Sequence, residues 1–121
     1  DKRSVFVVDD DHAAAASMAA LMISVGLVVE LHHSAEAFLA AYDGSRKGCL
    51  IFDMRMPGMS GLELLEALAA RNVIIPSICI SGYLDPASKE KVMQSGVMAI
   101  FEKPFADVAI CDAVRSALAQ D

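Results

Sequence analysis

Hydrophobic and polar positions along the chain alternate between two kinds of segment. Short runs that are almost continuously apolar and rich in Val, Ile and Phe occupy residues 4–9, 27–32, 49–53, 77–81 and 99–103. Such runs are typical of strands that are buried on both faces of a parallel sheet. Between them, residues 11–25, 34–43, 60–71, 86–95 and 105–119 show the spacing of amphipathic helices. The pattern therefore predicts five strand–helix units in succession.

Several of the predicted helices begin with residues that favour a helix start. Ser60 with Glu63 forms a capping box, in which the side chain of each residue accepts the backbone N–H of the other. Ser34 is an N-cap candidate, and Asp85 followed by Pro86 places a cap before a proline in the first turn. These signals fix the starts of three helices.

The first and last helices are each predicted to bury one apolar stripe. In the first helix the predicted core positions are Met18, Leu21, Met22 and Val25, and the predicted solvent-facing positions are Ala13, Ala16, Ala20 and Ile23. In the last helix the predicted stripe is Val108, Cys111, Val114 and Leu118. The solvent-facing positions of the first helix carry no charge, which suggests a docking surface.

Regular alternation of strand and helix predicts an α/β fold, because each crossover between parallel strands is right-handed and places a helix on a face of the sheet. The fold class that suits five such units is a flavodoxin-like (βα)5 doubly wound parallel sheet with strand order 2-1-3-4-5. In that arrangement a ligand site lies at the carboxyl ends of strands 1 and 3.

Composition narrows the classes of function. The chain has 121 residues, which we expect to form one domain, residues 1–121, with no output domain. Ten basic against sixteen acidic residues give a net charge of −6, which disfavours direct binding to nucleic acid or to anionic membranes. Cys49, Cys79 and Cys111 are odd in number and lie in apolar surroundings, as expected for reduced thiols in a cytoplasmic protein.

One uncharged stretch, residues 13–29, comes close to the length of a membrane helix. It is rich in small Ala residues, is interrupted by Ser17, Ser24 and Gly26, and lacks flanking basic residues. We therefore expect a helix of a water-soluble domain there and no association with the membrane.

Polar side chains collect where the predicted strands end. Strand 1 ends in Asp9, Asp10 and Asp11, and strand 3 ends in Asp53. Strands 4 and 5 end in Ser81 and in Lys103 followed by Pro104. Neighbouring strands lie about 4.8 Å apart, so the acidic cluster and Asp53 are adjacent, with Ser81 one strand further. Lys103 is two strands from Asp53, on the order of 10 Å, which only a long side chain can bridge.

Carboxylates crowded at one edge of a sheet repel one another, and a single lysine does not neutralise them. A hard divalent cation would, and Mg²⁺ takes one or two carboxylates, keeps several waters and binds phosphoryl oxygens. One carboxylate could then attack phosphorus to give an acyl phosphate. Mg²⁺, the Lys103 ammonium and the Ser81 hydroxyl would neutralise the phosphoryl oxygens from different sides. For Asp11 the simpler interpretation is a helix N-cap.

These motifs together resemble the receiver domain of bacterial two-component response regulators over essentially the whole chain. They are Asp9-Asp10, Asp53 followed by MRMPGMSGLELL, Ser81-Gly82, and Lys103-Pro104-Phe105. The stretches SAEAFLAAY, RMPGMSGLELL and FEKPF are most similar to the FixJ-like subfamily, whose receivers usually precede a helix-turn-helix DNA-binding domain.

The resemblance implies a role for each site residue. Asp53 would accept a phosphoryl group from a phosphohistidine of a sensor histidine kinase, and it would also contact the Mg²⁺ ion. Asp10 would bind the metal directly, Asp9 through water, and Arg55 through its backbone carbonyl. Ser81 would move to hydrogen-bond the phosphoryl group and Lys103 would pair with it, aimed by an expected cis bond to Pro104.

The same resemblance implies a signalling domain that catalyses only its own phosphorylation and dephosphorylation. Phosphorylation would change the face formed by residues 86–95, 99–103 and 105–119, and so control a homodimer or a C-terminal DNA-binding output domain for transcription regulation. The uncharged face of the first helix would receive the kinase, because small Ala side chains permit close approach.

The chain departs from the family pattern at one position. Ile100 stands where the family usually carries Tyr or Phe, and Phe101 is expected to face the opposite side of the strand. An aromatic switch at this position is therefore in question. Ser81 replaces the more common Thr and retains the hydroxyl.

Other functions fit the sequence less well. A binder of flavin mononucleotide would need an uncharged phosphate loop after strand 1, where this chain has three carboxylates. A phosphatase of the haloacid dehalogenase type would need a second aspartate two residues after Asp53, where Arg55 stands. His12, His32 and His33 have no Cys partners at zinc-ligand spacing and are interpreted as surface or structural. A phosphorylation-independent protein-interaction module on a receiver scaffold stays open as the alternative.

Overall fold

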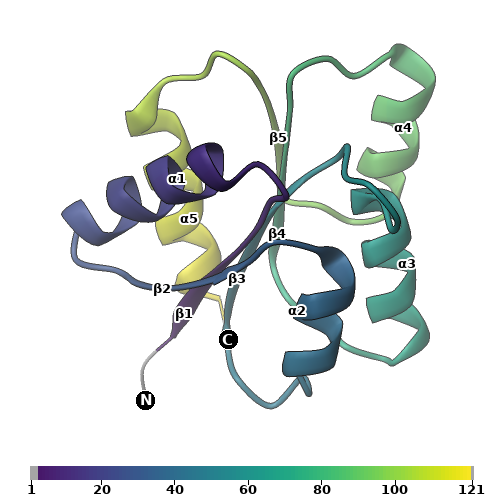
Figure 1. The fold of residues 1–121 in the computed structure, drawn as a ribbon, viewed down its shortest axis with the longest axis horizontal. Helices are drawn as coiled ribbons and strands as arrows, with labels where there is room; N and C mark the ends of the chain where they lie inside the picture. The colour runs from purple at the N-terminus through teal and green to yellow at the C-terminus, as the bar shows by residue number, and fades with distance from the viewer. Residues whose placement is uncertain (1–2, 121) are drawn as a thin grey trace.

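Figure 1 shows the computed structural model, which describes residues 3–120, as a central sheet with helices on both faces. The strands are β1 (Ser4–Val8), β2 (Val28–His32), β3 (Gly48–Asp53), β4 (Ser77–Ser81) and β5 (Ala99–Glu102). The helices are α1 (His12–Ser24), α2 (Ala35–Ala41), α3 (Gly61–Ala70), α4 (Pro86–Gln94) and α5 (Asp107–Leu118). All strand pairs are parallel and the order is β2-β1-β3-β4-β5. The predicted fold class and strand order are confirmed.

The sheet separates two hydrophobic clusters, and this explains the continuous apolar runs of the central strands. Helices α1 and α5 cover one face, while α2, α3 and α4 cover the other (Figure 1). Along β3, Leu50 and Phe52 face the second group of helices, whereas Cys49 and Ile51 face the first. Successive side chains point to opposite faces, so a strand covered on both sides needs an apolar residue at every position.

The predicted helix caps are present as hydrogen bonds. The Ser34 hydroxyl accepts the N–H of Ala37 at 3.0 Å, and the Asp85 carboxylate accepts the N–H of Ser88 at 2.8 Å. Ser60 and Glu63 form both bonds of the capping box, at 3.2 and 3.0 Å. Each cap satisfies an N–H group that has no partner within its helix.

The predicted stripe of α1 is confirmed. Met18 and Met22 are buried, and Leu21 and Val25 are half-buried. Two small residues that the pattern did not single out, Ala15 and Ala19, are buried as well. The four positions predicted to face solvent, Ala13, Ala16, Ala20 and Ile23, are all exposed.

The predicted stripe of α5 is wrong at one end. Val108 is 72% exposed, and the buried residues of the helix are Ile110, Cys111, Val114 and Ala117. The buried arc is centred near Val114. At 100° per residue Val108 lies about 120° from that centre, whereas Ile110 lies within about 40° of it. The sequence pattern therefore predicted the buried face of α5 on the side of Val108, whereas the buried face lies on the side of Ile110.

The three cysteines are buried free thiols, as predicted. Burial raises the pKa of Cys49 to about 12, and burial together with the Asp53 charge raises the pKa of Cys79 to about 12. At neutral pH both groups therefore stay protonated and unreactive. Within residues 3–120, no helix combines the length and the apolar character needed to span a bilayer.

An ion pair lies at the edge strand β2. The Arg46 guanidinium donates to both carboxylate oxygens of Glu30, at 2.9 and 3.0 Å. Its carbon also lies 5.1 Å from the centre of the Phe6 ring. His32 contacts the same carboxylate at 2.8 Å. This hydrogen bonding by Arg46, and secondarily by His32, lowers the pKa of Glu30 to about 2.

The first stability prediction concerns Gly61, where α3 begins against the core. A Cβ atom at this position would lie 2.5 Å from the ring of buried Phe52 and 3.0 Å from the Asp53 carbonyl oxygen. We expect Gly61→Ala to lower the free energy of unfolding by about 1–3 kcal/mol through overpacking, measured by urea denaturation. Helix propensity alone would change it by up to about 1 kcal/mol in the opposite direction. The matched control is Gly82→Ala, where a Cβ meets no atom within 4 Å. Equal effects of the two substitutions would contradict the packing argument.

The second prediction concerns the pH dependence of the Glu30–Arg46 pair. The pKa of folded Glu30 lies below its ordinary value of 4.5, so the pair stabilises the fold above pH 4.5 and loses this contribution as the pH falls toward 2. Because the pair is partly exposed, its contribution is less than about 1 kcal/mol. We expect an NMR titration of the Glu30 carboxyl to show a midpoint below 4.5 in the native chain, and a midpoint closer to 4.5 in Arg46→Gln. Identical midpoints would show that Arg46 is not the cause.

Candidate functional site

The parallel sheet brings the ends of its strands to one edge, and the predicted site residues lie there. Asp9 follows β1, Asp53 ends β3, Ser81 ends β4, and Lys103 follows β5. The Lys103 ammonium reaches across to Asp53, with Nζ 3.3 Å from Oδ2. The long side chain therefore closes the two-strand gap as predicted.

The backbone around Lys103 is tied to the neighbouring strand. The N–H of Lys103 donates to the Ser81 carbonyl oxygen at 2.8 Å, which extends the pairing of β4 and β5 by one bond. The peptide bond from Lys103 to Pro104 is cis, as the resemblance implied. The lysine thus leaves the sheet from a fixed backbone position.

Asp9 is a buried carboxyl group, with a relative exposure of 1%. Burial is the main cause that raises its pKa above the ordinary value, and the nearby charges of Asp53 and Asp10 raise it further. The N–H of Asp11, which donates to Asp9 Oδ1 at 3.0 Å, and the Lys103 charge act in the opposite direction. The neighbouring negative charges therefore oppose the ionisation of Asp9, and a bound cation would offset this effect.

The other two residues of the acidic run have different surroundings. Asp10 is exposed, and its carboxylate is accessible to solvent. Asp11 is the N-cap of α1 and accepts the N–H groups of Ala13 and Ala14 at 3.0 and 3.1 Å. The interpretation of Asp11 as a cap is confirmed, which leaves Asp9 and Asp10 for the site.

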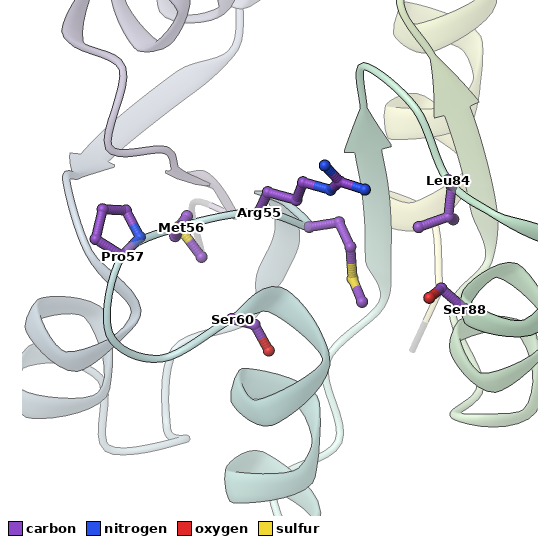
Figure 2. Close-up of a pocket in the computed structure, with 7 residues that line it drawn as sticks. Arg55, Met56, Pro57, Ser60, Leu84 and Ser88 are labelled. Carbon is purple, nitrogen blue, oxygen red and sulfur yellow. The ribbon is translucent and has the colours of Figure 1, made fainter.

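The two oxygens of Asp53 have separate partners. Oδ1 accepts the N–H of Arg55 at 2.9 Å, whereas Oδ2 faces Lys103. The side chain of Arg55 extends across a hollow of about 450 Å³ toward the side where Leu84 of the β4–α4 loop and Ser88 of α4 lie (Figure 2). The remaining lining comes from the β3–α3 loop, from Met54 to Ser60. Arg55 thus contributes a backbone group at Asp53 while its side chain lies in the hollow.

The donor set at this edge fits a magnesium ion. Carboxylates of Asp9, Asp10 and Asp53 and the backbone carbonyl of Arg55 are hard oxygen donors, which Mg²⁺ prefers. The charges of Asp53 and Asp10 add to the burial that raises the pKa of Asp9. Within residues 3–120, no group of three or more His, Cys, Asp or Glu side chains is placed to hold a metal ion, so Asp9, Asp10 and Asp53 do not form such a group by themselves. Mg²⁺ does not require such a cage, because it usually keeps several waters.

Ser81 is fully buried, and its hydroxyl donates to the carbonyl oxygen of Tyr83 at 2.9 Å. This bond closes the start of the β4–α4 loop. The Tyr83 ring itself is 62% exposed. The hydroxyl predicted to serve a phosphoryl group is therefore bound to the loop in this structure.

Ile100 and Phe101 lie on opposite faces of β5, as predicted. Ile100 is half-buried against the cluster under α2, α3 and α4. Phe101 packs against the cluster under α1 and α5, with its ring centre 6.0 Å from that of Phe105. The face of β5 toward α4 thus carries an aliphatic side chain where the family usually has an aromatic one.

Two contacts near the site were not predicted from the sequence. The Glu36 carboxylate, on α2, accepts the N–H of Met59 in the β3–α3 loop at 3.2 Å. His33 Nδ1 lies 3.3 Å from the backbone oxygen of Asp9, and its ring stacks on that of His12 with centres 3.8 Å apart. No spacing rule in the sequence points to either contact, because both join segments that are distant along the chain.

Comparison with known proteins agrees with this geometry. Residues 5–115 match the family described as response regulator receiver domain. The transcriptional regulatory protein FixJ of Rhizobium meliloti is 41% identical over 114 residues, covering 94% of this chain and 56% of the relative. The response regulator protein TodT of Pseudomonas putida is 40% identical over 119 residues, covering 98% of this chain and 52% of the relative.

A solved structure has the same fold as this chain. The crystal structure of FixJ-N superposes with a TM-score of 0.92 at 39% identity, covering 100% of this chain and 97% of that one. The chain spans about half the length of the curated relatives it matches. From the family match, the FixJ relatives and the shared fold, the chain belongs to the response regulator receiver domains, in their FixJ-like branch.

Proposed function

We propose that this receiver domain accepts a phosphoryl group on Asp53 from a sensor histidine kinase, in a Mg²⁺-dependent reaction. The observation that carries the proposal is the contact of Lys103 Nζ with Asp53 Oδ2 at 3.3 Å, beside the buried carboxyl of Asp9. The Lys103 ammonium lies at the Asp53 carboxylate, among other acidic side chains. It would stabilise the additional negative charge that Asp53 gains when it is phosphorylated.

The residues of the chain divide the work of the transfer. Asp9, Asp10, Asp53 and the Arg55 carbonyl would hold Mg²⁺, which when bound would supply positive charge to the phosphoryl oxygens. Asp53 Oδ2 forms the new bond to phosphorus as the bond from phosphorus to the kinase histidine nitrogen breaks, and the nitrogen keeps the electron pair. The Arg55 N–H holds Oδ1, which fixes the orientation of the nucleophile. Lys103 neutralises the added charge.

The switch would begin at Ser81. Its hydroxyl donates to Tyr83 O, and donating to a phosphoryl oxygen instead would release the start of the β4–α4 loop. Helix α4 follows this loop and buries one side chain of its own, Val92, so its displacement disturbs little of the core. Because Ile100 is aliphatic, the proposed switch acts through this loop and not through an aromatic rotamer on β5.

The partners follow from the surfaces and from the relatives. The face of α4, β5 and α5 would engage a second receiver or an output domain after phosphorylation. FixJ is named as a transcriptional regulatory protein, so we propose a DNA-binding output domain in the full-length protein. The exposed, uncharged positions Ala16 and Ala20 belong to α1, the helix that begins directly after the acidic run, and would receive the helices of the kinase.

The test of the central step is intact mass after incubation with acetyl phosphate and Mg²⁺. We expect one added phosphoryl unit on the native chain, because the activated carboxylate needs only a phosphodonor and the metal. The modification should disappear in Asp53→Ala and when the metal is omitted. Absence of both modification and Mg²⁺ binding in the native chain would favour the alternative, a phosphorylation-independent interaction module.

The kinase surface is tested by Ala16→Glu and Ala20→Glu. We expect phosphotransfer from the cognate kinase to slow by at least about tenfold, because a buried unpaired charge would be placed in the contact. Phosphorylation by acetyl phosphate should stay unchanged, since neither residue touches Asp53, and this serves as the control. Transfer from the kinase at the native rate would refute the assignment of this surface.

A further inference from the structure

The β3–α3 loop, residues 54–60, is fixed firmly at its two ends. At its start the N–H of Met54 donates to the Ile80 carbonyl oxygen at 3.0 Å, and the N–H of Arg55 donates to Asp53 Oδ1 at 2.9 Å. At its end the N–H of Gly61 donates back to the Met54 carbonyl oxygen at 3.0 Å. Hydrogen bonds of the backbone thus hold the loop both where it leaves β3 and where it joins α3.

The middle of the loop depends on a residue from another element. Met56 inserts its side chain into the core, with a relative exposure of 9%. Beyond it, the backbone of residues 56–59 makes one hydrogen bond within the described part of the chain, from the N–H of Met59 to Glu36 Oε2 at 3.2 Å. Glu36 lies in the first turn of α2.

A second observation places the Glu36 carboxylate against this turn. Gly58 adopts a φ of +75°, a conformation that favours glycine. A Cβ atom at this position would lie 2.7 Å from Glu36 Oε2. Glycine therefore permits both the backbone conformation and the close approach of the carboxylate, so the two residues form one unit.

We propose that Glu36 is a positioning residue for the metal site: by holding the Gly58–Met59 turn, it fixes the loop that presents the Arg55 carbonyl. The Arg55 carbonyl and the Met56 N–H form one peptide unit. The peptide unit that contains the Gly58 N–H follows two units later along the chain, so the two groups are close in the loop. Without Glu36, the loop beyond Met56 loses the hydrogen bond that links it to α2. The carbonyl would then sample more orientations, and metal binding would weaken. The inference rests on the proposed Mg²⁺-dependent function.

The test compares three variants, each of which replaces an exposed glutamate of a helix. Glu36→Ala removes the acceptor, and Glu36→Gln retains an oxygen acceptor without the charge. Glu66→Ala is the matched control, because Glu66 is an exposed helical glutamate whose loss changes the net charge of the chain equally. The probe is Mg²⁺ alone, titrated by calorimetry into each unphosphorylated protein at constant ionic strength. Urea denaturation of each variant separates loss of the fold from loss of the site.

We expect Glu36→Ala to weaken Mg²⁺ binding by about fivefold relative to Glu66→Ala, the size expected for one net hydrogen bond, and Glu36→Gln to restore most of the affinity. With acetyl phosphate, the Mg²⁺ concentration for half-maximal rate should rise in Glu36→Ala, while the rate at saturating Mg²⁺ stays near the native value. Equal affinities in Glu36→Ala and Glu66→Ala, or a Gln variant as weak as the Ala variant, would overturn the inference and leave the proposed function standing. A native chain that neither binds Mg²⁺ nor becomes phosphorylated would overturn both.

Discussion

Repulsion among carboxylates at one edge of the sheet is the constraint on which the rest of the site depends. Asp9 is buried, and its pKa is raised by burial and by the charges of Asp53 and Asp10. Two like charges on neighbouring strands, about 4.8 Å apart, repel by about 3 kcal/mol at an effective dielectric constant of 20. A hydrogen bond contributes about 1 kcal/mol net, so the backbone N–H groups that bind these carboxylates do not offset the repulsion by themselves. Cations at this edge would offset the repulsion, and the Lys103 ammonium beside Asp53 is one of them.

The fold meets this constraint by combining a rigid edge with loops that have few attachments. The strand ends that carry Asp53 and Ser81 belong to fully packed central strands. Within the connections that follow them, the start of the β4–α4 loop and the middle of the β3–α3 loop each have one such attachment, Ser81 to the Tyr83 carbonyl and Met59 to Glu36. Because each such bond contributes little, an added charge at this edge would be sufficient for the Ser81 hydroxyl to exchange one acceptor for another. In the proposed switch the loops would change while the sheet stays as it is.

The sequence predicted the features that follow from local chemistry and strand order. The continuous apolar strands, the caps at Ser34, Ser60 and Asp85, and the gathering of Asp9, Asp53 and Lys103 at one edge all depend on patterns within short segments or on the order of strands. The direction of a helix face depends on how the helix rotates against the sheet, which is why Val108 was misplaced.

The acceptor of a single hydroxyl and the reach of a surface carboxylate depend on tertiary geometry. The bond from Ser81 to the Tyr83 carbonyl and the role of Glu36 beside Gly58 were therefore visible only in the structure.

The buried thiols of the sheet have a further consequence. Cys49 and Cys79 lie in the inner strands β3 and β4, on opposite faces of the sheet, and both are fully buried, with burial raising their pKa to about 12. A thiol reagent would reach these two side chains only when the sheet opens, so the rate of labelling at Cys49 and Cys79, resolved from that at Cys111 on α5, reports opening of the sheet.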